Sequence, residues 1–384
     1  MKRTPLYEYH SEHGKTVEFA GYDMPLWYTS IVDEHLAVRN NVGIFDVSHM
    51  GRIAVKGREA GALTEALVPT RSASQPVGKS FYTLFLNTMA GIIDDLIIIK
   101  KAEDDYLFVV NAANKAKDFE HMGHLSRQYD VHLDDLTDAT TMIAIQGPSA
   151  SQALQKLTSQ NLSDIKRFNH VLTNVGGSSA TITRTGYTGE DGFEIILYDS
   201  GIMNNHLALS VWNELANKAK PCGLGARDSL RIEAGLPLYG SDIDDSTNPI
   251  EADLSWVISK EKTGYVGSDA VAGFLHSQPQ KLRRGVLLQD RIPRHGFQVK
   301  SEAGEDIGYV TSGSYSPILK KGIALAYLDS RYTQIGLPIK MAIRNEFTEG
   351  KIIKPPFYDE KSYGWKRATT SPQQYISRQL EPSS

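Results

Sequence analysis

The chain has 384 residues, of which 41% are hydrophobic and 22% are charged, so it is long enough for two or three packed domains. Its 41 Lys and Arg against 45 Asp and Glu give a formal charge of -4 with no run of one sign, which argues against a nucleic-acid partner. The single cysteine, Cys222, excludes an internal disulfide and a cysteine-based metal cluster.

The apolar stretches are short, and 96–99 and 107–110 are typical of them. A membrane-spanning helix needs roughly 20 apolar residues, so we expect no membrane partner. Pro5 and Glu8 fall where a signal peptide would have its apolar centre. We therefore expect a cytoplasmic protein.

A capped helix is predicted over about 31–41. Ser30 stands at the N-cap position, Asp33 follows three residues later, and apolar residues recur at helical spacing. Gly43 can end this helix.

A three-stranded meander follows, with strands over 81–87, 92–100 and 106–110. The first two strands are joined by the turn 88–91. Beyond the meander we predict a helix over 114–128, a strand over 142–145, a helix over 150–157, strands over 181–184 and 193–197, and helices over 203–219, 226–234 and 268–275.

The composition changes near residue 280, where Ser, Gln, Pro, Lys and Arg replace the apolar pattern. We therefore predict one region over 1–280 and a second over 281–365. Short strands at 285–288, 297–299, 307–310, 323–327 and 339–343 are typical of a small barrel or sandwich. The Ser, Thr, Gln and Pro of 366–384 indicate a flexible tail.

Two acids, Asp94 and Asp95, interrupt the apolar second strand of the meander. Neighbouring strand residues point to opposite faces, so only one of them can face a given cavity. Both acids could lie in water at a strand end. Alternatively, one is a carboxylate in an apolar wall, responding to a cation that develops in a substrate, with Tyr82, Asn111 and Tyr187 completing an aromatic pocket.

A glycine-rich loop over 186–192 precedes Glu194, which is either a recognition acid or an exposed strand residue. The run 223–228 lacks the third glycine of a dinucleotide fingerprint and follows no strand of a βαβ unit. It leaves a Gly-rich approach to a helix, where Arg227 either receives an anion or forms a structural ion pair.

Histidines give no sign of a metal or nucleophile site. His121 and His124 lie three apart on a predicted helix without a third ligand, so we predict no metal. Asp46, Ser48 and His49 fall within four positions, but members of a catalytic triad meet through space and have no reason to be neighbours in sequence.

Eight motifs, taken together, resemble the aminomethyltransferase family, the T-proteins of the glycine cleavage system. They occur in the family's order, and the resemblance runs from about residue 3 to about 363. The motifs are Thr4-Pro5-Leu6-Tyr7, Ala20-Gly21-Tyr22-Asp23-Met24-Pro25-Leu26, Gly43-Ile44-Phe45-Asp46-Val47-Ser48-His49-Met50, Gly91-Ile92-Ile93-Asp94-Asp95-Leu96, Ile145-Gln146-Gly147-Pro148, Arg184-Thr185-Gly186-Tyr187-Thr188-Gly189-Glu190, Gly223-Leu224-Gly225-Ala226-Arg227-Asp228 and Thr311-Ser312-Gly313.

The resemblance implies an α+β fold, with two α+β subdomains and a C-terminal β-barrel around a central folate channel. It implies an enzyme that takes the aminomethyl group from the lipoyl arm of H-protein. Tetrahydrofolate is the acceptor substrate, ammonia is released, and 5,10-methylenetetrahydrofolate is formed.

The resemblance also implies roles for individual residues. The second acid of the family's Ile-Asp-Asp-Leu motif, its important carboxylate, corresponds to Asp95. Glu194 and Arg227 are similar to folate-contacting positions. The other implied pocket residues are Tyr82, Asn111, Tyr187 and Met50, with Tyr363 as a C-terminal folate contact.

One departure concerns the turn before the acids, where Ala90-Gly91 replaces the family's Gly-Gly. We expect position 90 to keep a negative φ, which alanine tolerates. Two other functions share the resemblance. One is a folate-dependent demethylase of a small methylated sulfur or oxygen compound. The other is a folate-binding protein of iron–sulfur assembly, whose Lys-Gly-Cys-Tyr signature is missing around Cys222.

Overall fold

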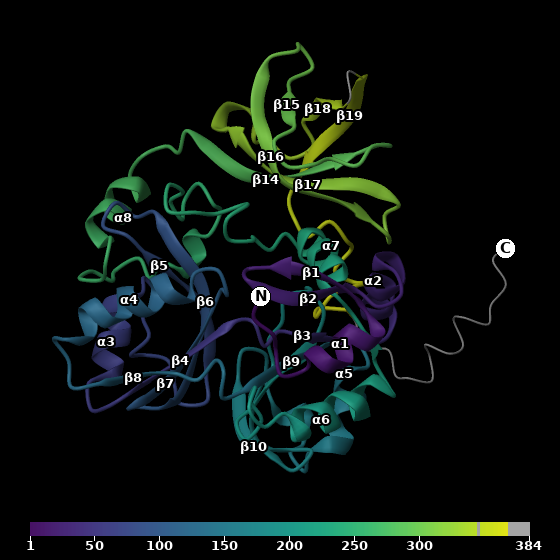
Figure 1. Cartoon of the computed structure of the whole chain (residues 1–384). Coiled ribbons are helices and arrows are strands. Elements are labelled where there is room, and N and C mark those ends of the chain that lie inside the picture. The colour runs from purple at the N-terminus through teal and green to yellow at the C-terminus, as the bar shows by residue number, and fades with distance from the viewer. Residues whose placement is uncertain (344–345, 368–384) are drawn as a thin grey trace.

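A computed structural model of the chain describes residues 1–343 and 346–367 (Figure 1). It contains two mixed sheet-and-helix layers and a closed C-terminal barrel, which confirms the predicted α+β class and the barrel. Most of the predicted tail, 368–384, lies outside the described residues. No helix in the described part of the chain is long and apolar enough to cross a membrane.

The first sheet contains the predicted meander and has the strand order β5-β6-β7-β4-β8. Helices α3 (Ala60–Leu67) and α4 (Lys115–Ser126) pack on one face, where apolar side chains of the strands alternate inward. The strands are β4 (Gly51–Lys56), β5 (Ser80–Leu86), β6 (Ile92–Ala102), β7 (Asp105–Val110) and β8 (His132–Asp135).

The second sheet has the order β10-β11-β12-β9-β3-β13, and it begins before the first sheet in sequence. Its strand β3 pairs directly with β9. All strands of the first sheet lie between β3 and β9 in sequence, so the first sheet is an insertion in the second. The strands are β3 (Gly43–Asp46), β9 (Thr141–Gln146), β10 (His170–Val175), β11 (Ser178–Thr183), β12 (Gly192–Leu197) and β13 (Lys220–Pro221).

The two sheets bury a shared apolar layer. Val109 and Ile99 of the first sheet belong to the same buried cluster as Phe45, Met142 and Ile196 of the second. The opposite face of the second sheet is covered by α1 (Tyr7–His13), α5 (Ala150–Leu154) and α6 (His206–Ala216). Short 3-10 turns lie at Gln155–Leu157, Leu162–Asp164, Ser255–Val257 and Ser330–Tyr332.

The N-terminal hairpin of β1 (Lys15–Phe19) and β2 (Tyr22–Trp27) precedes the predicted capped helix, α2 (Ile31–Asn40). The Ser30 side chain accepts a hydrogen bond of 3.0 Å from the backbone N–H of Asp33, which confirms the cap.

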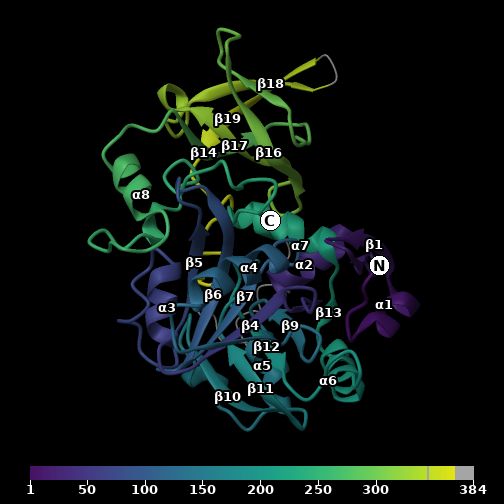
Figure 2. The same ribbon diagram turned by 60° about the vertical axis from the view of Figure 1, so that its left-hand side comes forward.

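The C-terminal barrel closes in the order β14-β17-β16-β15-β18-β19. It lies above the two sheets, and α7 (Leu224–Ala234) lies between the barrel and the sheets (Figures 1 and 2). Its strands are β14 (Lys281–Leu288), β15 (Gln298–Lys300), β16 (Asp306–Ser316), β17 (Lys321–Asp329), β18 (Pro338–Ile343) and β19 (Glu346–Ile353), and α8 (Ser268–Leu275) precedes them.

The expectation for Ala90 is wrong. Its φ is +63°, and its side chain is fully buried in an apolar cluster that includes Ile243 and Tyr265. Left-handed backbone costs alanine roughly 1–2 kcal/mol, which the buried surroundings of the turn offset. The next position is restricted to glycine for a different reason, because a Cβ at Gly91 would lie 1.8 Å from the carbonyl oxygen of Asp245.

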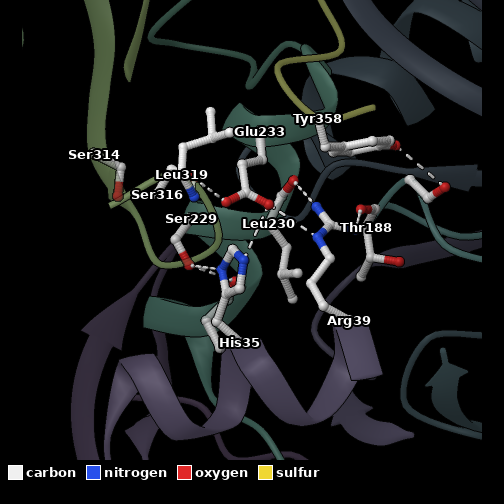
Figure 3. A network of polar contacts seen from close by, with 12 residues as sticks. His35, Arg39, Thr188, Ser229, Leu230, Glu233, Ser314, Ser316, Leu319 and Tyr358 are labelled. Atoms are coloured by element: carbon white, nitrogen blue, oxygen red, sulfur yellow. Dashed lines mark hydrogen bonds and ion pairs between the residues drawn. The ribbon is translucent and has the colours of Figure 1, made fainter. Parts of the chain in front are cut away.

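A buried ion network fixes α7 against α2 and the barrel (Figure 3). Arg39 Nε of α2 donates to Glu233 Oε2 of α7 at 2.9 Å, and His35 Nε2 lies 3.0 Å from the same oxygen. The Ser316 hydroxyl of β16 donates to the other Glu233 oxygen. Arg39 Nη1 also pairs with Glu190 of the glycine-rich loop at 3.1 Å. These carboxylates, with Arg39 and His35, have fully buried side chains.

Burial raises the pKa of Glu233, but the His35 hydrogen bond and the Arg39 charge outweigh it and lower the pKa overall. The Glu233 charge is therefore stabilised only while its partners are present.

Arg39→Met is expected to destabilise the protein by about 3–5 kcal/mol, since it leaves Glu233 and Glu190 charged, buried and short of a partner. Urea unfolding of the full chain measures the change. Arg58→Met is the matched control, because the Arg58–Asp130 pair is exposed and is expected to contribute less than about 1 kcal/mol. Equal effects of the two substitutions would contradict a structural role of the network.

Candidate active site

A cavity of about 420 Å³ lies where the two sheets, α7 and the barrel meet. This volume falls in the usual range for small-molecule sites. Tyr82 of β5, Glu194 of β12 and Leu325 of β17 all reach it, as do Tyr358 and Trp365 from the segment that follows the barrel. The cavity therefore needs all parts of the chain to form.

Seven of the eight site residues indicated by the sequence line this cavity; they are Met50, Tyr82, Asp95, Asn111, Tyr187, Glu194 and Arg227. The eighth, Tyr363, lies behind the wall, where its ring is 6.5 Å from that of Tyr358 in an edge contact. Contact of all eight residues with folate stays a prediction.

Asp95 faces the cavity on β6, whereas its neighbour Asp94 points to the other face of the sheet and is 0% exposed. The Tyr82 hydroxyl donates to Asp95 Oδ2 at 3.0 Å, and Asn111 Nδ2 donates to Asp95 Oδ1 at 2.9 Å. Neither acid therefore lies in water at a strand end. The strand alternation separates them into one acid in the cavity and one behind it.

Burial raises the pKa of Asp95 to about 7, and the charge of Asp94 adds to the rise. The hydrogen bonds from Tyr82 and Asn111 oppose it. The carboxyl group is thus present in both protonation states near neutral pH, which suits a group that meets a developing positive charge or a mobile proton.

Glu194 and Arg227 line another part of the cavity wall. Glu194 is 8% exposed, the Thr185 hydroxyl donates to its carboxylate, and burial raises its pKa. Arg227 lies over the Tyr187 ring at 4.7 Å and directs Nη2 towards the sulfur of Met50 at 3.8 Å.

Within the described residues, no carboxylate lies at ion-pair distance from the Arg227 guanidinium. Burial lowers its pKa, although the neighbouring Glu194 and Tyr187 counteract this effect. The structural ion pair considered for Arg227 is therefore not formed, and its N–H donors remain available to a ligand.

Several cavity residues were missed by the sequence reasoning, namely His49, Trp256, Tyr358 and Trp365. Trp256 is 67% exposed and stacks on Tyr82, with ring centroids 5.4 Å apart. It lies in no motif, so the sequence carried no signal for it. His49 lies within a quoted motif, next to Met50, and its proximity to that residue could have indicated it.

No group of three or more His, Cys, Asp or Glu side chains is arranged to hold a metal ion among residues 1–343 and 346–367. The expectation of a metal-free site stays a prediction.

Asp95→Asn is expected to raise the unfolding temperature at about pH 8 but not at about pH 4. The folded protein binds the Asp95 proton more tightly than the unfolded chain, because the pKa rises from 3.8 to about 7. Folding stability is therefore lost as the pH rises through this interval, and asparagine removes the loss. Thermal unfolding at both values measures it, with the exposed Asp134→Asn on the same sheet as control. An unfolding temperature of Asp95→Asn below that of the parent at about pH 8 would contradict the raised pKa.

Comparison with known proteins places these features in a family. The family model described as the GCVT N-terminal domain matches residues 6–262 of this chain. The family model described as the glycine cleavage T-protein C-terminal barrel domain matches residues 281–359. The boundaries predicted at 280 and 365 remain a prediction of domain organisation.

Relatives of known name cover nearly the whole chain. The aminomethyltransferase of Thermus thermophilus is 46% identical over 359 residues, covering 93% of this chain and 99% of that protein. The aminomethyltransferase of Thermoanaerobacter pseudethanolicus is 41% identical over 375 residues, covering 94% and 99%. The crystal structure of the glycine cleavage system aminomethyltransferase T from Bartonella henselae superposes with a TM-score of 0.87 at 34% identity, covering 95% and 99%. Both domain models and full-length relatives agree, and the chain belongs to the aminomethyltransferase family of glycine cleavage T-proteins.

Proposed function

We propose that this protein is the aminomethyltransferase of a glycine cleavage system, with lipoylated H-protein as donor and tetrahydrofolate as acceptor. The observation that carries the proposal is the Asp95 carboxylate in the wall of the cavity that the sheets, α7 and the barrel build together. Family membership over nearly the whole chain supports it and does not favour the demethylase. The single cysteine favours a reducing compartment, and we propose the cytoplasm.

The reaction develops positive charge, and Asp95 is suited to meet it. One folate nitrogen forms a bond to the methylene carbon while the bond from that carbon to ammonia breaks. The carbon–sulfur bond to the lipoyl arm then breaks, which leaves an iminium-like centre on folate near N5 and N10. The second folate nitrogen closes the ring and loses its proton, and the sulfur takes up a proton to give dihydrolipoyl H-protein. A carboxylate already in place stabilises that centre without solvent reorganisation. Asp95 acts by electrostatics and hydrogen bonding to N10, with Tyr82 and Asn111 holding its two oxygens in position.

Glu194 and Arg227 are suited to hold the reduced pterin. The Glu194 carboxylate can accept hydrogen bonds from pterin N–H groups, and the Arg227 guanidinium can donate to a ring acceptor or to a carboxylate. The Tyr187 ring, whose hydroxyl donates to the Pro237 carbonyl, provides an aromatic wall beneath Arg227. These contacts orient the pterin relative to Asp95.

A reconstituted assay with methylaminated H-protein and tetrahydrofolate tests the function. The proposal requires ammonia release and 5,10-methylenetetrahydrofolate in equal amounts, both dependent on H-protein. Transfer of a methyl group from small sulfur or oxygen donors, with none from H-protein, would establish the demethylase instead.

Asp95→Asn is expected to retain folate binding within about tenfold while kcat falls by about 10²–10³, since the negative charge is lost and the shape is kept. Equilibrium folate binding and initial rates of the reconstituted reaction measure the two quantities. Asp134→Asn, on the same sheet and exposed, is expected to behave as the parent. If Asp95→Asn turns over at the rate of the parent, Asp95 does not stabilise the positive charge of the reaction.

Glu194→Gln and Arg227→Met are each expected to weaken tetrahydrofolate binding by about tenfold or more, because each removes a charge-assisted hydrogen bond in a buried wall. Titration with tetrahydrofolate measures the affinity, and circular dichroism checks the fold. Arg184→Met serves as control, since Arg184 pairs at a partly exposed position with Asp191 of the glycine-rich loop and neither residue lines the cavity. Unchanged affinity in both site variants would show that these residues do not hold the pterin.

A further inference from the structure

A third acid, Asp118, lies behind the cavity wall on helix α4. Its side chain is 0% exposed, and it does not line the cavity. Neither of its carboxyl oxygens accepts a hydrogen bond from any donor in the described part of the chain. A buried carboxylate without donors is costly, whereas a carboxylic acid at the same place could act as a donor itself.

Asp94 is the acceptor that this position offers. It is also 0% exposed, and it accepts hydrogen bonds from the Asn111 backbone N–H at 3.0 Å and from Asn114 Nδ2 at 2.5 Å. The backbone N–H of Asp118 donates to the Asn114 carbonyl at 2.8 Å, which fixes the start of α4 beside Asp94. Asn114 thus contacts both Asp94 and Asp118, and the two carboxyl groups lie within hydrogen-bonding reach of each other.

A single amide connects Asp94 to the cavity. Asn111 Nδ2 donates to Asp94 Oδ1 at 2.9 Å and to Asp95 Oδ1 at 2.9 Å. The order from the helix to the cavity is thus Asp118, Asp94, Asn111 and Asp95.

The three carboxyl groups cannot all be ionised, because their surroundings supply too little positive charge. Lys117, the neighbour of Asp118 on α4, directs its ammonium to the Tyr239 hydroxyl at 2.7 Å and to Asp245 at 3.3 Å. His121, one turn further on, has a buried Nε2 without a partner, and burial lowers its pKa, so it stays neutral.

The cavity wall contains cations, but in the described part of the chain Arg227 and Arg283 form no ion pair with the three acids. Arg227 lies over Tyr187 and beside the Met50 sulfur, and Arg283 donates to the Ala252 and Gly235 carbonyls.

The groups next to Asp95 and Asp94 on this side are neutral hydroxyls. Tyr82 and Tyr187 face Asp95 with their pKa values raised by burial, and Tyr239 near Asp94 has a raised pKa for the same reason. At least one of the three acids must therefore keep a proton at neutral pH.

That proton belongs on Asp118. Burial raises the pKa of Asp118 to about 10, and the charge of Asp94 adds to the rise. Burial also raises the pKa of Asp94, but hydrogen bonds from Asp118, Asn114 and Asn111 oppose this effect. Asp94 thus accepts more hydrogen bonds than Asp95 or Asp118, so its negative charge is the best stabilised of the three.

We propose that Asp118 is a positioning residue, a neutral carboxylic acid that donates a hydrogen bond to Asp94 and so keeps Asp94 ionised behind Asp95. The Asp94 charge then makes Asp95 a stronger proton acceptor inside the cavity. This inference rests on the proposed function. It adds a hydrogen-bonded pair of acids, Asp118 and Asp94, that lies outside the cavity and sets the pH range in which Asp95 is ionised.

Two substitutions of Asp118 separate the hydrogen bond from the packing. Asp118→Asn keeps a donor to Asp94, cannot ionise and has nearly the same shape. Asp118→Leu removes the donor. Met122→Ala is the matched control, because Met122 is buried one turn further along α4 and carries no charge.

The pH dependence of kcat/KM in the reconstituted reaction is the first measurement. Asp118→Leu is expected to move the acid limb to lower pH by about one unit, because Asp94 then takes up a proton and no longer raises the Asp95 pKa. Asp118→Asn is expected to keep the limb of the parent. Met122→Ala is expected to lower the unfolding temperature without moving the limb.

Infrared difference spectroscopy supplies a second measurement that does not depend on turnover. The parent minus Asp118→Asn spectrum at about pH 8 is expected to contain the carbonyl band of a protonated carboxyl group, because Asp118 remains neutral there.

The outcomes are distinguishable. A parent enzyme without H-protein-dependent turnover would overturn the proposed function, and the infrared band would still decide the state of Asp118. An active parent whose acid limb does not move in Asp118→Leu would overturn the inference and leave the function intact. If Asp118→Leu does not fold, two results would still overturn the inference. One is an acid limb of the kcat/KM profile that moves in Asp118→Asn, and the other is the absence of the protonated-carboxyl band from the infrared difference spectrum.

Discussion

The poor solvation of one carboxylate in an apolar wall is the interaction on which the whole site depends. Asp95 keeps its proton to about neutral pH because burial and Asp94 both disfavour its charge. An acid on the open surface would be ionised and screened, and it would respond weakly to a cation forming in a substrate. The alternation of strand β6 divides the two acids between the cavity and the interior.

The remaining parts of the fold maintain this environment. The first sheet supplies Asp95, the second supplies Glu194 and α7 supplies Arg227, so the wall exists only when these elements are held together. The network around Arg39 and Glu233 connects α2, α7 and the barrel through buried charges (Figure 3). Such pairs contribute little net stability compared with apolar packing, but they tolerate few alternative arrangements. We infer that their main contribution is to fix how α7 presents Arg227.

Much of this could be predicted from local sequence signals. The Ser30 cap, the meander of β5, β6 and β7, and helix α8 lie where the pattern placed them, because caps, alternation and turns act within a few residues. The pairing of β3 with β9 joins residues about a hundred positions apart and has no local signature. Ala90 shows the opposite error, since a favourable local preference for negative φ yields to the packing of the turn.

The candidate site divides in the same way. Asp95 and Arg227 lie in the quoted motifs, Glu194 follows the glycine-rich loop, and the family resemblance assigns a role to each of them. Trp256 reaches the cavity from a 3-10 turn and Trp365 from the segment after the barrel, and neither lies in a motif. Asp118 shows its character only through missing hydrogen-bond donors. Burial and donor count are properties of the folded molecule, so no spacing rule could have revealed them.

Carbon-13 NMR of protein labelled at the aspartate side-chain carboxyl carbon, with Asp95→Asn to assign the resonance, measures the pKa of Asp95 directly. We expect a titration midpoint near 7 in the folate-free protein. A midpoint at the ordinary value of 3.8 would show a well-solvated carboxylate and contradict the electrostatic role given to Asp95.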